Sequence, residues 1–137
     1  MGIINCFYGR RNKQDKAKNL VAEDNKENQK YLNFILRRTY EIDFCESPDD
    51  FFILISHKKY DIVIIDITLK GEHCGLSLIR KLKRKQEYRE IPIVGLSAHV
   101  FNKDRKKALE AGADVYLTKP IENKKLMDTL EKLLAQK

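Results

Sequence analysis

Five short apolar runs alternate with helical patterns along most of the chain, and this alternation restricts the fold more than any other feature. The runs lie at 19–23, 41–45, 60–66, 91–97 and 113–117. The third, YDIVIID, is almost continuous in Ile and Val, as is typical of a strand buried on both faces. Alternating β and α segments form a mostly parallel sheet covered by helices. The sequence therefore predicts a doubly wound α/β domain of type (βα)5, with three layers.

Several helix ends are marked by residues that suit them. Asn25 precedes a helical pattern and is a good N-cap, and Ser47-Pro48 combines an N-cap with proline at the first helical position. Gly112 follows the pattern at 101–111 and can take the left-handed conformation found after a last turn. A closed eight-stranded barrel would need about 250 residues. The chain has 137, so an open sheet is expected.

The positive charge is concentrated at the N-terminus. The formal net charge is +7, but residues 1–19 contain five basic groups and one acid, so the remainder carries only +3. We divide the chain into a basic N-terminal extension, 1–18, and a domain, 19–137. No DNA-binding motif follows the extension, so no direct nucleic-acid binding is expected.

The sequence favours a cytoplasmic protein. No apolar run approaches the roughly 18 residues of a membrane helix, and residues 1–8 make a poor signal peptide. The three cysteines, Cys6, Cys45 and Cys74, are odd in number and widely spaced, so neither a disulfide framework nor a zinc site is expected. Residues 1–6 approach the N-myristoylation pattern, but Cys6 stands where Ser or Thr is required. A loosely docked basic tail is therefore favoured over membrane contact.

Polar residues stand where the predicted strands end. Glu23 and Asp24 end the first strand, Asp66 the third and Ser97 the fourth, and Lys119 follows the fifth. In an open parallel sheet, ligands bind beyond the carboxyl ends of the strands, where the strand order reverses. For the order 2-1-3-4-5 that point lies between strands 1 and 3, so these five side chains are expected at one crevice.

These residue types suit phosphoryl transfer. Converging carboxylates are costly unless a proton or a metal joins them. A cluster of oxygen ligands without His or Cys suits Mg²⁺, which prefers a few carboxylates together with water and phosphate. Lys119 adds a fixed cation, Ser97 a hydroxyl donor and Asp66 a carboxylate nucleophile.

Four segments carry a resemblance to a known family. LVAEDNKENQ (20–29), YDIVIID (60–66) with the Gly71/Gly75 loop, LSA (96–98) and YLTKP (116–120) resemble the receiver domains of two-component response regulators. The resemblance covers residues 19–137 in order. It implies a flavodoxin-like fold with sheet order 2-1-3-4-5.

The resemblance also implies a function. Asp66 would accept a phosphoryl group from a histidine kinase or a histidine phosphotransfer protein. Mg²⁺ would be held by Glu23, Asp24, Asp66 and the backbone carbonyl of Thr68. The domain would act as a signalling switch rather than as an enzyme, passing its state to a downstream protein that the sequence does not identify.

Further roles follow from the same resemblance. Ser97 and Lys119 would bind the phosphoryl oxygens, and Tyr116 would change rotamer when Ser97 is drawn inward. The readout face would comprise the helix at 101–111, the strand at 113–117 and the last helix. The Lys119–Pro120 bond would be cis, as in relatives.

The chain departs from the family pattern in the loop after Asp66. Leu69-Lys70 replaces the usual Met-Pro, Cys74 stands where relatives often have Asp, and the loop to Gly75 is one residue longer than is common. These changes leave the five polar positions intact, but they alter contacts with any particular kinase. Thr68 and His99 occupy positions that tune the lifetime of the phosphoryl group in the family.

Three other functions remain open at this stage. A Mg²⁺ phosphatase of the haloacid dehalogenase type also uses an Asp nucleophile, but it needs a second Asp where this chain has Thr68. A flavodoxin-like cofactor binder would have to hold an anion beside Glu23 and Asp24, which repel one. A pseudo-receiver acting only as a docking module is the remaining alternative. The Met-Gly start favours a single-domain regulator over a fragment of a longer protein.

Overall fold

The computed structural model describes residues 16–69, 74–98 and 102–136, and these form one α/β domain. The elements are β1 (Ala17–Ala22), α2 (Lys26–Leu36), β2 (Tyr40–Cys45), α3 (Pro48–His57), β3 (Ile62–Asp66), α4 (Cys74–Arg84), the 3₁₀ turn η2 (Gln86–Tyr88), β4 (Ile93–Ser97), α5 (Asn102–Ala111), β5 (Val115–Thr118) and α6 (Asn123–Ala135). The strands form one sheet in the order β2-β1-β3-β4-β5, and each neighbouring pair is parallel. The predicted fold and strand order are confirmed.

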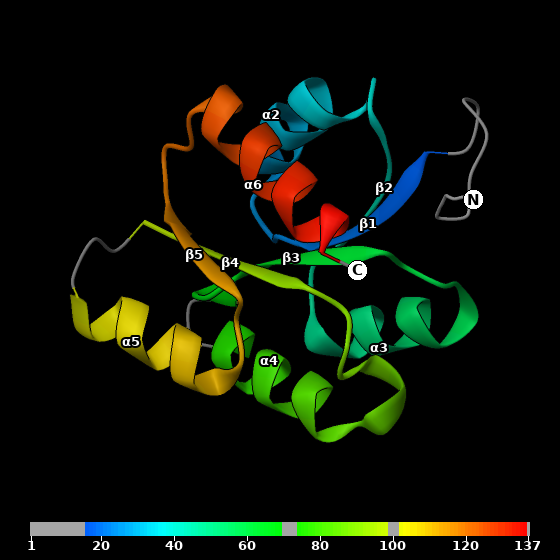
Figure 1. Cartoon of the computed structure of the whole chain (residues 1–137), viewed down its shortest axis with the longest axis vertical. Helices are drawn as coiled ribbons and strands as arrows, with labels where there is room; N and C mark the ends of the chain where they lie inside the picture. The colour runs from blue at the N-terminus through cyan, green and yellow to red at the C-terminus, as the bar shows by residue number, and fades with distance from the viewer. Residues whose placement is uncertain (1–15, 70–73, 99–101, 137) are drawn as a thin grey trace.

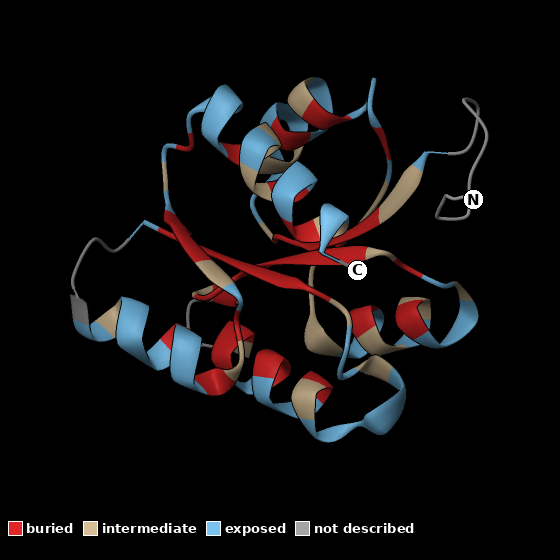
Figure 2. Ribbon diagram, in the orientation of Figure 1, coloured by how far each residue is buried: buried red, intermediate tan, exposed pale blue. Residues whose placement is uncertain are grey.

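The sheet is the middle of three layers. Helices α2 and α6 cover one face, and α3, α4 and α5 cover the other (Figure 1). The buried residues are concentrated in the strands and on the helix faces that turn toward them (Figure 2). No helix in the described part of the chain has the length and apolarity that crossing a bilayer demands.

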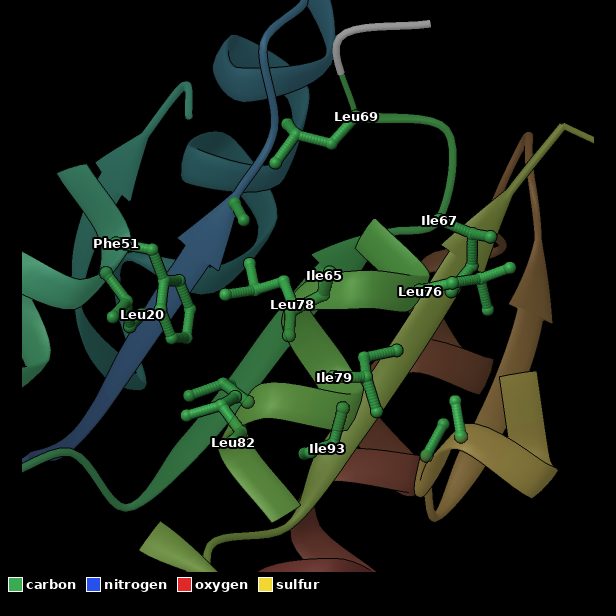
Figure 3. Packing of buried hydrophobic residues seen from close by; sticks show 14 of the residues in the cluster. Leu20, Phe51, Ile65, Ile67, Leu69, Leu76, Leu78, Ile79, Leu82 and Ile93 are labelled. Carbon is green, nitrogen blue, oxygen red and sulfur yellow. The ribbon is translucent and has the colours of Figure 1, made fainter. Parts of the chain in front are cut away.

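The core consists of two apolar clusters, one on each side of the sheet. Strand β3 is buried along its whole length and contributes alternate residues to the two clusters, with Val63 and Ile65 on one side and Ile62 and Ile64 on the other. Figure 3 shows the cluster in which residues of β3 and α4, such as Ile65 and Leu78, pack together. A strand buried on both faces explains the unbroken Ile/Val run in the sequence.

The predicted helix ends are largely confirmed. Asn25 accepts a hydrogen bond from the amide of Asn28 at 2.9 Å, and Ser47 accepts one from the amide of Asp50 at 3.2 Å. Gly112 has φ +127°, the left-handed region that favours glycine. The described cysteines, Cys45 and Cys74, are free thiols, the first buried and the second partly exposed.

Several strand boundaries differ from the predicted ones by about two residues. β1 begins at Ala17, within the predicted extension, because its pairing with β2 reaches Tyr40. β3 begins at Ile62 rather than at residue 60, and β4 at Ile93 rather than at residue 91. β5 starts later than predicted because the amide of Ala113 donates to the carbonyl of Ala108 and so completes the end of α5. Residue composition alone does not reveal such backbone partners.

Candidate functional site

Asp66 is the last residue of the central strand β3 and is only 4% exposed. The loop that follows holds one of its carboxylate oxygens, because the amide and the hydroxyl of Thr68 both donate to Oδ1 at 3.0 Å. The other oxygen, Oδ2, faces the ammonium of Lys119 at 3.1 Å. The side chain is therefore fixed in orientation, with one oxygen held by its own loop and the other turned toward a cation from β5.

Glu23 and Asp24 follow directly after β1, the neighbour of β3 in the sheet. Glu23 is 1% exposed, and its amide continues the pairing with β2 by donating to the carbonyl of Cys45 at 3.0 Å. One carboxylate oxygen from each of Glu23, Asp24 and Asp66 lies within 4.8 Å of the others. The structure thus brings together three acids from two adjacent strands, in an arrangement that can hold a metal ion.

Lys119, which follows β5, contacts acids at the ends of both β1 and β3. Its Nζ lies 2.7 Å from Oε1 of Glu23 and 3.1 Å from Oδ2 of Asp66. The residue follows β5, and its amide donates to the carbonyl of Ser97 at the end of β4. The next peptide bond, Lys119–Pro120, is cis, as predicted. A single ammonium therefore contacts two buried carboxylates at the carboxyl edge of the sheet.

The electrostatics of the site follow from burial and from close like charges. Burial raises the pKa of Glu23, and the neighbouring charge of Asp66 raises it further, while the hydrogen bond from Lys119 opposes both effects. Burial works against the charge of Lys119, but the hydrogen bonds and charges of Glu23 and Asp66 outweigh it, so the pKa of Lys119 is raised. Lys119 therefore stays charged, and a further cation at the site would stabilise the ionised form of the acids.

The remaining predicted residues lie at the same edge or near it. Ser97 ends β4, is fully buried, and stands one position beyond the residue that pairs with Asp66. Tyr116 lies in β5 with its side chain buried in the cluster on the α3–α4–α5 side of the sheet. The roles of Ser97 and Tyr116, and of the Thr68 carbonyl as a metal ligand, stay predictions. His99 lies outside the described residues.

Two supporting residues were not assigned these roles from the sequence. The side-chain amide of Gln29 donates to the carbonyl of Glu23 at 2.5 Å, which fixes the turn between β1 and α2. Gly75, in the first turn of α4, lies so close to β3 that an added Cβ would collide with the carbonyl oxygen of Asp66 and stand 2.7 Å from Cα of Ile67. Gln29 and Gly75 were visible in the sequence, but only their neighbours in space explain them, and Gly71 lies outside the described residues.

Comparison with known proteins agrees with this geometry. The family model of the response regulator receiver domain matches residues 20–131. The chain belongs to the receiver domain family. The receiver domain is 31% identical over 116 residues to the phosphate regulon transcriptional regulatory protein PhoB of Escherichia coli, covering 84% of this chain and 50% of PhoB.

Two further relatives are large signalling proteins. The receiver domain is 35% identical over 120 residues to hybrid signal transduction histidine kinase I of Dictyostelium discoideum, covering 81% of this chain and 7% of the kinase. It is 30% identical over 136 residues to the sensory/regulatory protein RpfC of Xanthomonas campestris, covering 97% of this chain and 19% of RpfC. The chain thus spans half the length of PhoB and much less of the other two.

Solved receiver domains have the same fold. The receiver domain of a sensor histidine kinase from Pseudomonas aeruginosa, with a magnesium ion coordinated in its active site cleft, superposes with a TM-score of 0.80 at 26% identity, covering 88% of this chain and 99% of that one. The receiver domain of a signal transduction histidine kinase from Syntrophus aciditrophicus gives 0.79 at 27% identity, covering 88% and 91%. The protein is therefore a receiver domain of two-component signalling.

Proposed function

We propose that this receiver domain is a phosphorylation switch that takes a phosphoryl group onto Asp66. The observation that carries the proposal is the position of Lys119, whose ammonium contacts both Glu23 and Asp66 beside a cluster of three carboxylates. When all three acids are ionised, this cluster keeps two uncompensated negative charges. A site built around such a charge excess is poised to recruit a divalent cation together with an anionic phosphoryl group.

The residues present fit Mg²⁺. Glu23, Asp24 and Asp66 supply carboxylate oxygens close together, and the backbone carbonyl of Thr68 would complete the protein ligands. Mg²⁺, when bound, supplies positive charge that stabilises the oxygens of the transferring phosphoryl group. The acids need no rearrangement between strands to share an ion, because β1 and β3 are adjacent and hold them at one edge. The magnesium ion in the Pseudomonas receiver domain supports this assignment.

The transfer itself is a substitution at phosphorus. Oδ2 of Asp66 forms the new bond to phosphorus, and the bond from phosphorus to the imidazole nitrogen of the donor histidine breaks, leaving the imidazole with the electron pair. The two hydrogen bonds from Thr68 hold Oδ1 and so orient the carboxylate. Lys119 already faces Oδ2, and Ser97 is the hydroxyl at the same edge, so both can donate to the phosphoryl oxygens. The donor is a histidine kinase or a histidine phosphotransfer protein.

The switch would act through the face formed by α5, β5 and α6. Phosphorylation replaces a carboxylate with a more highly charged group and draws Ser97 and Lys119 toward it, which changes the end of β4 and the start of the β5–α6 loop. Tyr116 lies in β5, three residues before Lys119, and would change rotamer with this movement. We propose that the domain works in the cytoplasm and turns over no separate substrate.

The direct test is intact-mass analysis after incubation with Mg²⁺ and acetyl phosphate. We expect a gain of one phosphoryl group in the natural protein, none in Asp66→Asn, and an unchanged gain in Asp128→Asn, a matched loss of one carboxylate on the exposed face of α6. Absence of the adduct at every Mg²⁺ concentration would instead support the docking role of a pseudo-receiver. Continuous release of phosphate from a phosphoester would support a phosphatase.

A further inference from the structure

A second cleft lies at the opposite end of α4 from Asp66. It has a volume of about 520 Å³ and is lined by residues of α3, of the last turns of α4 and of the η2 segment: Phe52, Ser56, Lys81, Arg84, Lys85, Glu87 and Tyr88. The first turn of α4 packs on the carbonyl of Asp66 through Gly75, and a helix of 11 residues spans about 16 Å. The cleft is therefore separate from the phosphorylation site, although one helix connects the two.

Cations surround the cleft, and none of them is paired with an acid in the part of the chain that the structure describes. Lys81, Arg84 and Lys85 are exposed, and none of them forms an ion pair with another residue of the described ranges. Glu87 is the one acid among the lining residues, so the lining carries a net charge of +2. Basic residues in the last turn of a helix interact favourably with the helix dipole. The dipole does not by itself explain why three basic residues line one cleft. The cleft attracts anions.

Aromatic rings distinguish this cleft from a plain basic surface. Phe52 of α3 and Tyr88 of η2 are half-buried, so each keeps part of its ring accessible while the rest packs on the core. Lys85 places its ammonium 5.8 Å from the centre of the Phe52 ring, within the range of a cation–π contact. Planar π-systems stack on such rings, and cations beside a ring suit a ligand that is both aromatic and anionic.

From this combination we infer that the cleft binds a nucleoside phosphate, with the base against Phe52 and Tyr88 and the phosphates toward Lys81 and Arg84. The volume is within the range of small-molecule sites, which is roughly 300–1,000 Å³. The hydroxyl of Ser56 donates to the carbonyl of Ile53 at 2.8 Å, so its oxygen can accept a hydrogen bond from the sugar or the base. This site lies beyond the proposed phosphorylation function and does not depend on it, because none of its residues belongs to the acidic cluster.

The test is a titration of the ¹⁵N-labelled full chain with ATP, tripolyphosphate and adenosine, in EDTA so that no divalent metal contributes. We expect the amide shifts with ATP to centre on α3 and on residues 81–88, and ATP to bind at least tenfold more tightly than either fragment. Shifts centred on Asp66 and Lys119, or equal affinities for ATP and tripolyphosphate, would overturn the assignment.

Variants separate the two halves of the site. Lys81→Glu with Arg84→Glu should weaken ATP binding at least tenfold. Lys106→Glu with Lys107→Glu, the same charge change on exposed positions of α5, should alter it less than twofold. Phe52→Leu keeps an apolar side chain but removes one of the two rings, so the preference for ATP over tripolyphosphate should fall, while the affinity for tripolyphosphate stays unchanged. If both double variants lose ATP binding equally, ATP is attracted only by the net charge of the protein, and the site is refuted.

Discussion

Removal of one acid from the cluster should stabilise the metal-free receiver domain. In Asp24→Asn, one negative charge disappears within 4.8 Å of the two buried carboxylates, Glu23 and Asp66. At that distance each like-charge pair costs about 0.9 kcal/mol in bulk water and about 3.5 kcal/mol at an effective dielectric constant of 20. Asp24 is partly exposed to water, so the repulsion of each pair is closer to the value for bulk water. Loss of its favourable interaction with the start of α2 subtracts about 0.5 kcal/mol.

The expected net effect in EDTA is a gain of about 1–2 kcal/mol in the free energy of unfolding. With an ordinary urea dependence, this raises the unfolding midpoint by about 0.5–1 M. Mg²⁺ should reverse the order of the two proteins. At one hundred times its dissociation constant for the natural domain, the ion stabilises that domain by about 2.7 kcal/mol, and it should stabilise the variant far less.

The assay is urea unfolding followed by circular dichroism, in EDTA and in a Mg²⁺ series. Glu110→Gln, which removes an acid from the exposed surface of α5, is the matched control and should behave as the natural protein does in both conditions. The reasoning fails if Asp24→Asn is no more stable than the natural protein without metal. It also fails if Mg²⁺ stabilises both proteins equally, because the three acids would then not share one ion.

Three shorter predictions concern packing, acid stability and thiol reactivity. Gly75→Ala should destabilise the domain by about 3 kcal/mol in urea unfolding and slow phosphorylation by acetyl phosphate, because its Cβ meets the rigid backbone of Asp66. Burial opposes the charge of Asp43, but hydrogen bonds from its lysine and tyrosine partners lower its pKa. The pKa of Asp43 is therefore lower in the folded state than in the unfolded state. The ionised carboxylate contributes its full stabilisation of the fold above about pH 5, and this contribution disappears as the pH falls through the folded-state pKa. Asp43→Asn should therefore lose about 1 kcal/mol at pH 7 and little at pH 2, as urea midpoints across pH will show. Burial raises the pKa of Cys45 to about 12, so in a variant lacking the other two cysteines this thiol should react with Ellman's reagent at pH 8 only on unfolding.

The succession of strands and helices along the chain and the residues at the strand ends were accessible from the sequence because they depend on local patterns, whereas the order of the strands in the sheet came from the resemblance to receiver domains. Hydrophobic period, N-caps such as Asn25 and the left-handed Gly112 act within a few residues, so the sequence predicts them directly. A parallel sheet then places every strand's carboxyl end at one edge, which is why Glu23, Asp66 and Lys119 could be assigned to one site before any distance was known.

Only the tertiary structure decided which of these groups touch and what supports them. Lys119 contacts Glu23 across 96 positions of sequence, and no local pattern reveals that one ammonium serves two carboxylates. Gly75 is a loop glycine in the sequence, and its necessity arises from the backbone of Asp66 beside it. Phe52 and Lys85 likewise look like a core residue and a solvated residue until α3 and α4 bring them together. Local periodicity determines the elements, whereas side-chain contacts between elements depend on how the whole chain packs.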